Sequence, residues 1–113
     1  NILASNFDDE IIGDNASNLI NAGLGNDLIF GNAGNDIYFF DENHGVDKII
    51  ENGDDIADSI KFSSAIKPEN LFFARVENNL EIFTDKQKNH KIIIENQFNI
   101  VIKKCFIFWK TFD

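Results

Sequence analysis

A period of nine residues runs through the first half of this chain and limits what that half can fold into. In four successive units, counted from Ala4, the sixth residue is an acid or its amide and the eighth is large and apolar. The sixth residues are Asp9, Asn18, Asp27 and Asp36, and the eighth residues are Ile11, Ile20, Ile29 and Tyr38. Because these columns stay in phase, the period indicates a solenoid in which each unit repeats the same local structure.

A fifth unit, residues 42–50, follows a two-residue insertion and restores the same columns with Asp47 and Ile49. Within a unit, three residues such as Leu28-Ile29-Phe30 suit a short strand whose middle side chain points inward. The other six residues must turn the chain, and the glycines that gather there permit a positive φ. Two units therefore make one coil, and we expect residues eighteen apart to lie side by side.

This stacking would place acidic side chains against one another. Asp9 would lie beside Asp27 on one edge of the coils, and Asn18 beside Asp36 on the other. Carboxylates at the strand spacing of ~4.8 Å repel each other unless a cation bridges them. A hard divalent cation would do so, because it takes oxygen ligands, which the carboxylates and the carbonyls of the tight turns supply.

The charge of the chain is uneven. Nine of its 19 acidic residues and none of its ten basic residues lie in residues 1–47, while the acids and bases that follow are balanced. Such an acidic segment repels itself unless cations neutralise it, and it argues against binding to nucleic acid. The longest apolar run, Cys105–Trp109, is five residues. A membrane-spanning helix needs ~20 such residues, so no transmembrane segment is expected.

The units AGLGNDLIF and GNAGNDIYF, residues 22–39, resemble the nonapeptide G-G-x-G-x-D-x-U-x of the repeats-in-toxin (RTX, haemolysin-type) family. Residues 4–21 are similar to two degenerate copies. The resemblance implies calcium as the ligand and an all-β fold, with a parallel β-roll (a right-handed β-solenoid) in residues 1–62. It also implies that each ion lies between two stacked turns. One turn offers its first and third carbonyls and its acid, and the next offers its second and fourth carbonyls and its acid.

Carried over to this sequence, the resemblance implies three calcium sites. The first combines Ala4, Asn6 and Asp9 with Gly23, Gly25 and Asp27. The second combines Gly13, Asn15 and Asn18 with Asn32, Gly34 and Asp36. The third combines Ala22, Leu24 and Asp27 with Asn43, Gly45 and Asp47. Because Asn18 removes a charge from the second site, we expect the first and third sites to bind calcium more tightly.

After Gly53 the period fades, and residues 63–113 are predicted to cap the roll with a small antiparallel β-sheet. Residues 58–62 are expected to form the last strand of the roll, residues 71–84 a hairpin and residues 91–98 a third strand. This order resembles the calcium-binding-related segment that follows RTX repeats. For residues 99–113 three interpretations remain: a regular strand, part of a C-terminal export signal, or a degenerate tail.

No catalytic motif is present in the sequence, so no enzyme activity is expected. His44 and His90 are isolated in polar stretches and are predicted to be solvated. Cys105 lies in an apolar run and is predicted to be a buried thiol.

The resemblance finally implies a calcium-binding module at the C-terminal end of a larger secreted bacterial RTX protein, such as a toxin, adhesin or exoenzyme. Its partners would be calcium ions, the type I secretion apparatus and the upstream domains of the parent protein. It would fold on binding calcium outside the cell or at the bacterial cell surface. Two alternatives remain open. The chain could be a substrate-binding or accessory module of a secreted polysaccharide-active enzyme, or a calcium-free structural roll used for protein–protein contact.

Overall fold

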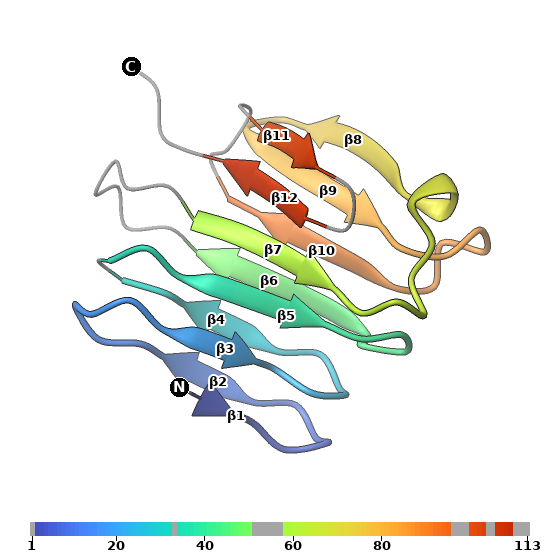
Figure 1. The fold of residues 1–113 in the computed structure, drawn as a ribbon. Helices are drawn as coiled ribbons and strands as arrows, with labels where there is room; N and C mark the ends of the chain where they lie inside the picture. The colour runs from blue at the N-terminus through green and yellow to red at the C-terminus, as the bar shows by residue number, and fades with distance from the viewer. Residues whose placement is uncertain (1, 33, 51–57, 96–99, 104–105, 110–113) are drawn as a thin grey trace.

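The computed structural model describes residues 2–32, 34–50, 58–95, 100–103 and 106–109 (Figure 1). These residues form short β-strands and one 3₁₀ turn, η1 (Pro68–Asn70), and no α-helix. The strands are β1 (Ile2–Leu3), β2 (Glu10–Ile12), β3 (Leu19–Asn21), β4 (Leu28–Phe30), β5 (Ile37–Phe40), β6 (Val46–Ile50), β7 (Asp58–Phe62), β8 (Phe72–Val76), β9 (Asn79–Phe83), β10 (Lys91–Ile94), β11 (Ile100–Lys103) and β12 (Phe106–Trp109). The predicted all-β class is confirmed.

Successive strands of the first half alternate between two six-stranded sheets. One sheet has the order β1-β3-β5-β7-β12-β11, and the other has the order β2-β4-β6-β10-β9-β8. From β1 to β7 all pairing is parallel, and Ile2 pairs with Ile20 and Ile11 with Ile29, as the eighteen-residue coil predicts. Figure 1 shows the two layers of strands running through the molecule. This parallel arrangement fits a β-roll.

The core lies between the two sheets and is built from the middle residue of each repeat strand. These residues are the buried Ile11, Ile20, Ile29, Tyr38, Ile49 and Ile60. Their neighbours along each strand point outward, so a three-residue strand buries one large side chain. Each burial of this kind stabilises the fold by roughly 1.5–3 kcal/mol. The apolar column predicted from the sequence is therefore the column that holds the sheets together.

The insertion before the fifth unit lengthens one turn without disturbing the register. Ile49 pairs with Ile29, twenty residues earlier, and both remain fully buried. In the same turn Asn43 and Gly45 have positive φ values of 62° and 93°. The extra residues are therefore taken up where the backbone already turns, and Asp47 keeps its place in the acid column.

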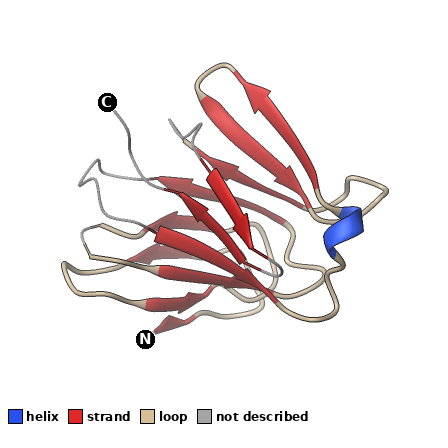
Figure 2. Ribbon diagram, turned by 45° about the horizontal axis from the view of Figure 1, so that its top comes forward, coloured by secondary structure: helices blue, strands red, loops and turns tan. Residues whose placement is uncertain are grey.

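The second half of the chain differs from the predicted small antiparallel sheet. Its strands extend the two existing sheets: β10 adds to β6 in parallel and carries β9 and β8, while β12 adds to β7 in antiparallel and carries β11. The physical reason is that β6 and β7 would otherwise be open edges with unpaired backbone groups. The predicted hairpin is confirmed as β8 and β9, and the third strand, predicted over residues 91–98, is confirmed over residues 91–94 as β10, while residues 96–98 lie outside the described residues. Figure 2 shows η1, in blue, beside the ends of this hairpin.

Eight residues of the tail, residues 99–113, form strands, as the strand interpretation expects. Residues 100–103 and 106–109 form the antiparallel pair β11 and β12. Cys105, predicted to be a buried thiol, lies outside the described residues. No helix in the described residues is long and apolar enough to cross a membrane.

Candidate metal centre

In the first acid column Asp9 and Asp27 directly precede β2 and β4, and Asp47 is the second residue of β6. The carboxylates of Asp27 and Asp47 each accept a hydrogen bond from the backbone N–H of the acid in the preceding coil. Asp27 Oδ1 accepts from Asp9 N at 2.8 Å, and Asp47 Oδ1 accepts from Asp27 N at 3.0 Å. The predicted stacking of Asp9, Asp27 and Asp47 is thus confirmed, and it is held by the backbone as well as by the strand register.

The second column, at the turns before β3, β5 and β7, repeats this geometry. Asp36 Oδ1 accepts from Asn18 N at 2.9 Å, and Asp58 Oδ1 accepts from Asp36 N at 2.8 Å. Asp58 is 1% exposed and continues the column, although it was not among the predicted ligands. Its signal in the sequence was Ile60 two residues later, which repeats the acid-x-apolar phase of the earlier units.

Two carboxylate oxygens in these columns are buried and have no hydrogen-bond partner in the described structure: Asp27 Oδ2 and Asp36 Oδ2. A buried carboxylate oxygen without a partner is costly, so native proteins almost always satisfy it. Each of these oxygens belongs to the middle acid of its column, with an acid or amide in the coil on either side. A cation between the coils would satisfy them.

The protonation of the buried acids reflects the same crowding. Burial, together with the neighbouring charges of Asp47 and Asp9, raises the pKa of Asp27 to about 7, although the hydrogen bond from the backbone N–H of Asp9 opposes the rise. Burial likewise raises the pKa of Asp36 to about 6 and that of Asp47 to about 7. Without a cation, the fold therefore resists the ionised form of these carboxylates near neutral pH.

The turns beside the columns have a shared backbone form. The predicted second-position residues Gly23, Asn32 and Asn43 and the fourth-position residues Gly25, Gly34 and Gly45 all have positive φ, between 62° and 93°. The turns also stack closely. A Cβ added to Gly34 would lie 2.5 Å from the carbonyl oxygen of Ala16, and one added to Gly25 would lie 2.6 Å from the carbonyl carbon of Phe7. The glycines are thus required both by φ and by the approach of the preceding coil.

No group of three or more His, Cys, Asp or Glu side chains that could hold a metal occurs among the described residues. A metal in the columns would therefore need backbone carbonyls in addition to pairs of side-chain oxygens. Carboxylate and carbonyl oxygens are the ligands that calcium prefers, and it accepts six to eight of them. The residues that are present fit calcium in donor chemistry and in the two unpartnered carboxylate oxygens.

The three predicted sites differ in how their groups are engaged. In the first, both oxygens of Asp9 accept from the Ser5 hydroxyl at 2.8 and 2.9 Å. In the second, Asn18 Nδ2 donates to Asp14 Oδ1, and the Gly13 carbonyl accepts from Asn32 Nδ2.

In the third site Asp27 and Asp47 lie together, and a histidine side chain also contacts Asp47. Asp47 Oδ2 lies 2.8 Å from His44 Nδ1, and the Gly45 carbonyl accepts from Lys91 N at 3.0 Å. Two further residues were predicted to supply carbonyl ligands to this site: Ala22, which is buried, and Leu24, which is exposed.

His44 was predicted to be solvated, and this prediction is wrong. The side chain is 1% exposed, because β10 and the loop before it cover the fifth unit. Nε2 lies 2.8 Å from Thr84 Oγ1, and burial lowers the pKa of the imidazole to about 4. His90 is half-buried, and its Nδ1 accepts from Gly45 N at 3.1 Å. The only feature of the sequence that could have indicated the contact between His44 and Asp47 was their spacing of three residues.

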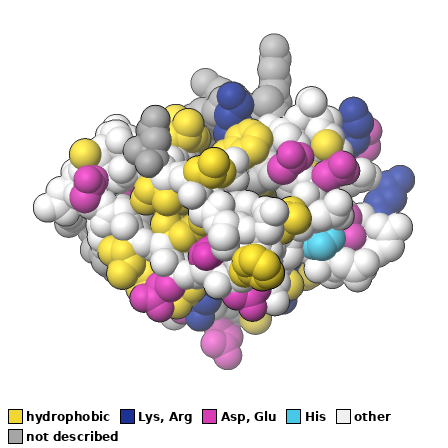
Figure 3. Space-filling model, turned by 90° about the horizontal axis from the view of Figure 1, so that it is seen from below, with side chains coloured by type: hydrophobic (Ala, Val, Ile, Leu, Met, Phe, Trp, Pro, Cys, Tyr) yellow, Lys and Arg dark blue, Asp and Glu magenta, His cyan; other side chains and the backbone are white. Residues whose placement is uncertain are grey.

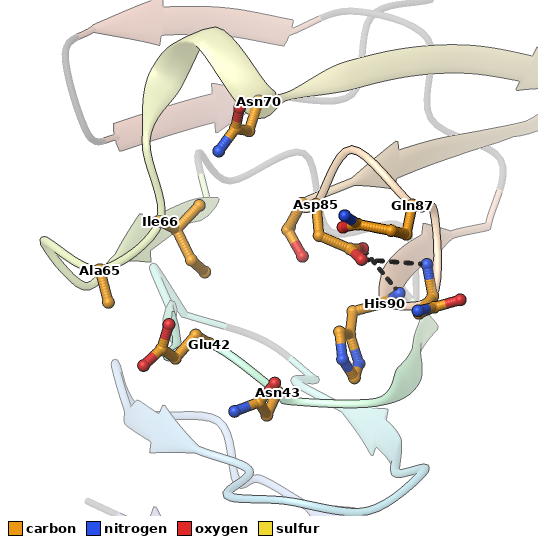
Figure 4. Close-up of a pocket in the computed structure, with 10 residues that line it drawn as sticks. Glu42, Asn43, Ala65, Ile66, Asn70, Asp85, Gln87 and His90 are labelled. Carbon is orange, nitrogen blue, oxygen red and sulfur yellow. Dashed lines mark hydrogen bonds between the residues drawn. The ribbon is translucent and has the colours of Figure 1, made fainter.

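The loop that covers His44 also borders a pocket of about 310 Å³ (Figure 4). The pocket is lined from three segments, residues 42–43, 65–70 and 84–90. Asp85 holds the last of these segments, because it accepts from the backbone N–H groups of Asn89 and His90. Figure 4 shows His90 beside Asn43, at the turn that leads to Asp47.

The surface at the other end of the coils is partly apolar. Leu3 and Phe7 are each 79% exposed and Ile12 is 63% exposed, all within the first coil. Figure 3 shows the face that points down in Figure 1, where both hydrophobic and acidic side chains reach the surface. Leu3 lies in β1 and Ile12 in β2, and each of these strands pairs on one side only.

Residues 3–42 match the family model of the RTX calcium-binding nonapeptide repeat, in four copies. RTX nonapeptide repeats bind Ca²⁺. The match includes Asp9, Asn18, Asp27 and Asp36, and it ends before Asp47 and Asp58. No curated protein matches the chain.

Proposed function

We propose that the chain is a calcium-binding module whose repeat half folds around ions held between stacked turns, because residues 3–42 match the family model of the RTX calcium-binding nonapeptide repeat. The observation that carries this proposal is the pair of buried, unpartnered oxygens, Asp27 Oδ2 and Asp36 Oδ2. Each belongs to a carboxylate with a raised pKa. A divalent ion would supply both the missing partner and the missing charge.

The proposed ligands are the three sets predicted from the sequence. Their side-chain members are Asp9 with Asp27, Asn18 with Asp36, and Asp27 with Asp47. Asp27 would serve two ions, which agrees with its central place in the column and its high pKa of about 7. The carbonyl donors would come from turns in which positive φ recurs at the second and fourth positions.

The proposed architecture is a right-handed β-roll over residues 1–62, followed by a second unit over residues 63–113. The parallel pairing from β1 to β7 supports the first part. The second unit would cover the end of the roll, since β10 and β12 pair with its last strands, β6 and β7. In this arrangement neither unit is catalytic. The repeat is a structural calcium-binding element.

We further propose that the module belongs to the C-terminal end of a larger secreted bacterial RTX protein and folds after type I export. The absence of Lys and Arg from residues 1–47 supports this, because nine acids there oppose folding until cations neutralise them. Calcium modules that work outside cells bind at about 10⁻⁴–10⁻³ M. Such a chain would stay unfolded in a cytosol poor in calcium and fold outside.

The test is a comparison of far-ultraviolet circular dichroism in chelator, in ~10 mM calcium and in ~10 mM magnesium. We expect strand signal to appear with calcium and not with magnesium, because magnesium demands tighter octahedral geometry and keeps its waters. Calorimetry on the same samples counts the ions. A spectrum that is folded in chelator and unchanged by calcium would contradict the proposal and favour a calcium-free structural roll.

A further inference from the structure

The first acid column ends at the fifth unit. In the next strand of that sheet, β10, the residue paired with Asp47 is Ile92, and both side chains are fully buried. The coil that follows Asp47 in space therefore offers no carboxylate at this position. Asp47 is the last acid of its column in the described part of the chain, and no further ion could be shared beyond it.

The last acid differs from the middle acids in the partner of its second oxygen. Asp27 Oδ2 has no partner among the described residues, whereas Asp47 Oδ2 lies 2.8 Å from His44 Nδ1. The first oxygens behave alike, since each accepts a backbone N–H from the coil before. A protonated Nδ1 at this place donates to the carboxylate that an ion would otherwise have to satisfy.

The ring of His44 is fixed on its other side by the C-terminal half of the chain. Nε2 lies 2.8 Å from Thr84 Oγ1, so a proton on Nδ1 leaves Nε2 to accept from the hydroxyl. The ring also meets Phe40 edge-on, with ring centroids 5.2 Å apart. With both nitrogens bonded and the side chain 1% exposed, His44 has one orientation available.

The same loop also holds the turn that would donate carbonyls to the third ion. Gly45 N donates to His90 Nδ1 at 3.1 Å, and the Gly45 carbonyl accepts from Lys91 N at 3.0 Å. Thr84 N donates to the His90 carbonyl at 3.2 Å and closes the loop. Residues 84–91, which we call the clamp loop, therefore contact both His44 and Gly45.

From this geometry we propose that His44 is a positioning residue that ends the calcium column and, through Thr84, makes the third calcium site depend on the clamp loop. The proposal rests on the calcium-binding function proposed above. His44 does not bind the ion. It holds the Asp47 carboxylate in place through Oδ2, the oxygen that does not accept from Asp27 N, and the clamp loop holds His44. The third site is then complete only when the C-terminal half is docked.

Two amide substitutions of His44 distinguish the role of Nδ1 from that of Nε2. In His44→Asn the amide can take the place of Nδ1 and still donate to Asp47, whereas in His44→Gln it takes the place of Nε2 and reaches only Thr84. Hydrogen bonds to charged groups contribute enough that we expect His44→Gln to weaken the third site about tenfold. His44→Asn should stay within about threefold of the natural chain.

The readout is a calcium titration of the whole chain followed by ¹H–¹⁵N spectra. Gly34 and Gly45 lie in turns that belong only to the second and the third proposed site, so their amide signals report these two sites separately, while Gly25 lies in the turn that the first and third sites share. We expect His44→Gln to shift the midpoint at Gly45 and to leave Gly34, on the other edge, unchanged. Equal weakening at all three glycines, or equal midpoints in the Asn and Gln variants, would overturn the proposal.

A second variant tests the link to the clamp loop. Thr84→Val keeps the volume of the side chain and leaves His44 beside Asp47, but removes the hydroxyl at Nε2. We expect it to weaken the midpoint at Gly45 and to leave the midpoint at Gly34 unchanged, and an unchanged midpoint at Gly45 would refute the coupling. If the natural chain shows no calcium-dependent shift at any of the three glycines, the proposed function itself fails, and that result is distinct from every outcome above.

Discussion

Replacing Asp27 by asparagine should stabilise the calcium-free chain and weaken its response to calcium. The amide of the Asp27→Asn variant keeps an oxygen that can accept from Asp9 N, so the backbone contact between coils is retained. The substitution removes the buried charge that faces Asp9 and Asp47. The substitution therefore tests the effect of the Asp27 charge while the hydrogen bond to Asp9 N is kept.

The magnitude follows from the pKa of Asp27. Its rise from 3.8 to about 7 corresponds to at most about 4 kcal/mol of folding free energy at pH 8. Because water at the edge of the turns screens the charge, we expect about 2 kcal/mol. The raised pKa contributes stability that is complete below pH 3.8 and is lost as pH rises through about 7. The calcium-free natural chain should thus gain stability from pH 8 to pH 6, and Asp27→Asn should gain less.

Calcium should reverse the order of stability of the natural chain and the Asp27→Asn variant. An ion at ten times its dissociation constant stabilises the folded state by roughly 1.4 kcal/mol. Asp27 is proposed to serve the first and third sites, so the variant should lose up to about 2.8 kcal/mol of the gain with calcium. In chelator at pH 8 the variant is then the more stable protein, and in calcium it is the less stable one.

The assay is circular dichroism at pH 8 and pH 6. In chelator, where the repeat half starts unfolded, folding is driven by an added osmolyte, and in calcium unfolding is driven by urea. Glu10→Gln is the matched control, because it removes one charge from an exposed residue in the same acidic half. The lowered pKa of His44 costs stability as pH falls below 6.5 towards about 4, and this loss cancels in the comparison because the natural chain and Asp27→Asn share it. If Asp27→Asn and Glu10→Gln change the stability of the calcium-free chain equally, burial of the Asp27 charge is not the reason for the stabilisation. If it keeps the full calcium gain, Asp27 is not a ligand.

Two further substitutions test the second site and the turns. Asn18→Asp should raise the calcium affinity of the second site in calorimetry, since it pairs a second charge with Asp36; it should also lower calcium-free stability, because Asp14 loses an N–H donor and gains a like charge. An unchanged affinity would mean that this site does not form. Gly34→Ala should destabilise the repeat half by about 1–3 kcal/mol even in saturating calcium, because φ is 93° and the added Cβ meets Ala16. Unaltered unfolding curves would contradict that reading of the turn.

Much of the repeat half could be predicted from the sequence because every coil needs the same residue types at the same positions. An inward apolar residue such as Ile29 must recur once per strand, and a glycine such as Gly34 must recur where the backbone turns left-handed. The eighteen-residue register and the stacked columns of Asp27 and Asp36 follow from that repetition. The resemblance to RTX repeats rests on the same residues, and the family match covers them.

Where the period fades, only the tertiary structure decided the outcome. The strand pattern of the second half predicted a hairpin and a third strand, but local alternation does not say which edge a strand will join, and β10 and β12 joined β6 and β7. For the same reason His44 looked solvated. Its environment depends on Thr84, forty residues later in the chain, whose hydroxyl reaches the imidazole only after β10 has paired with β6. A repeat encodes contacts between equivalent positions, and this contact joins two positions that no repeat relates.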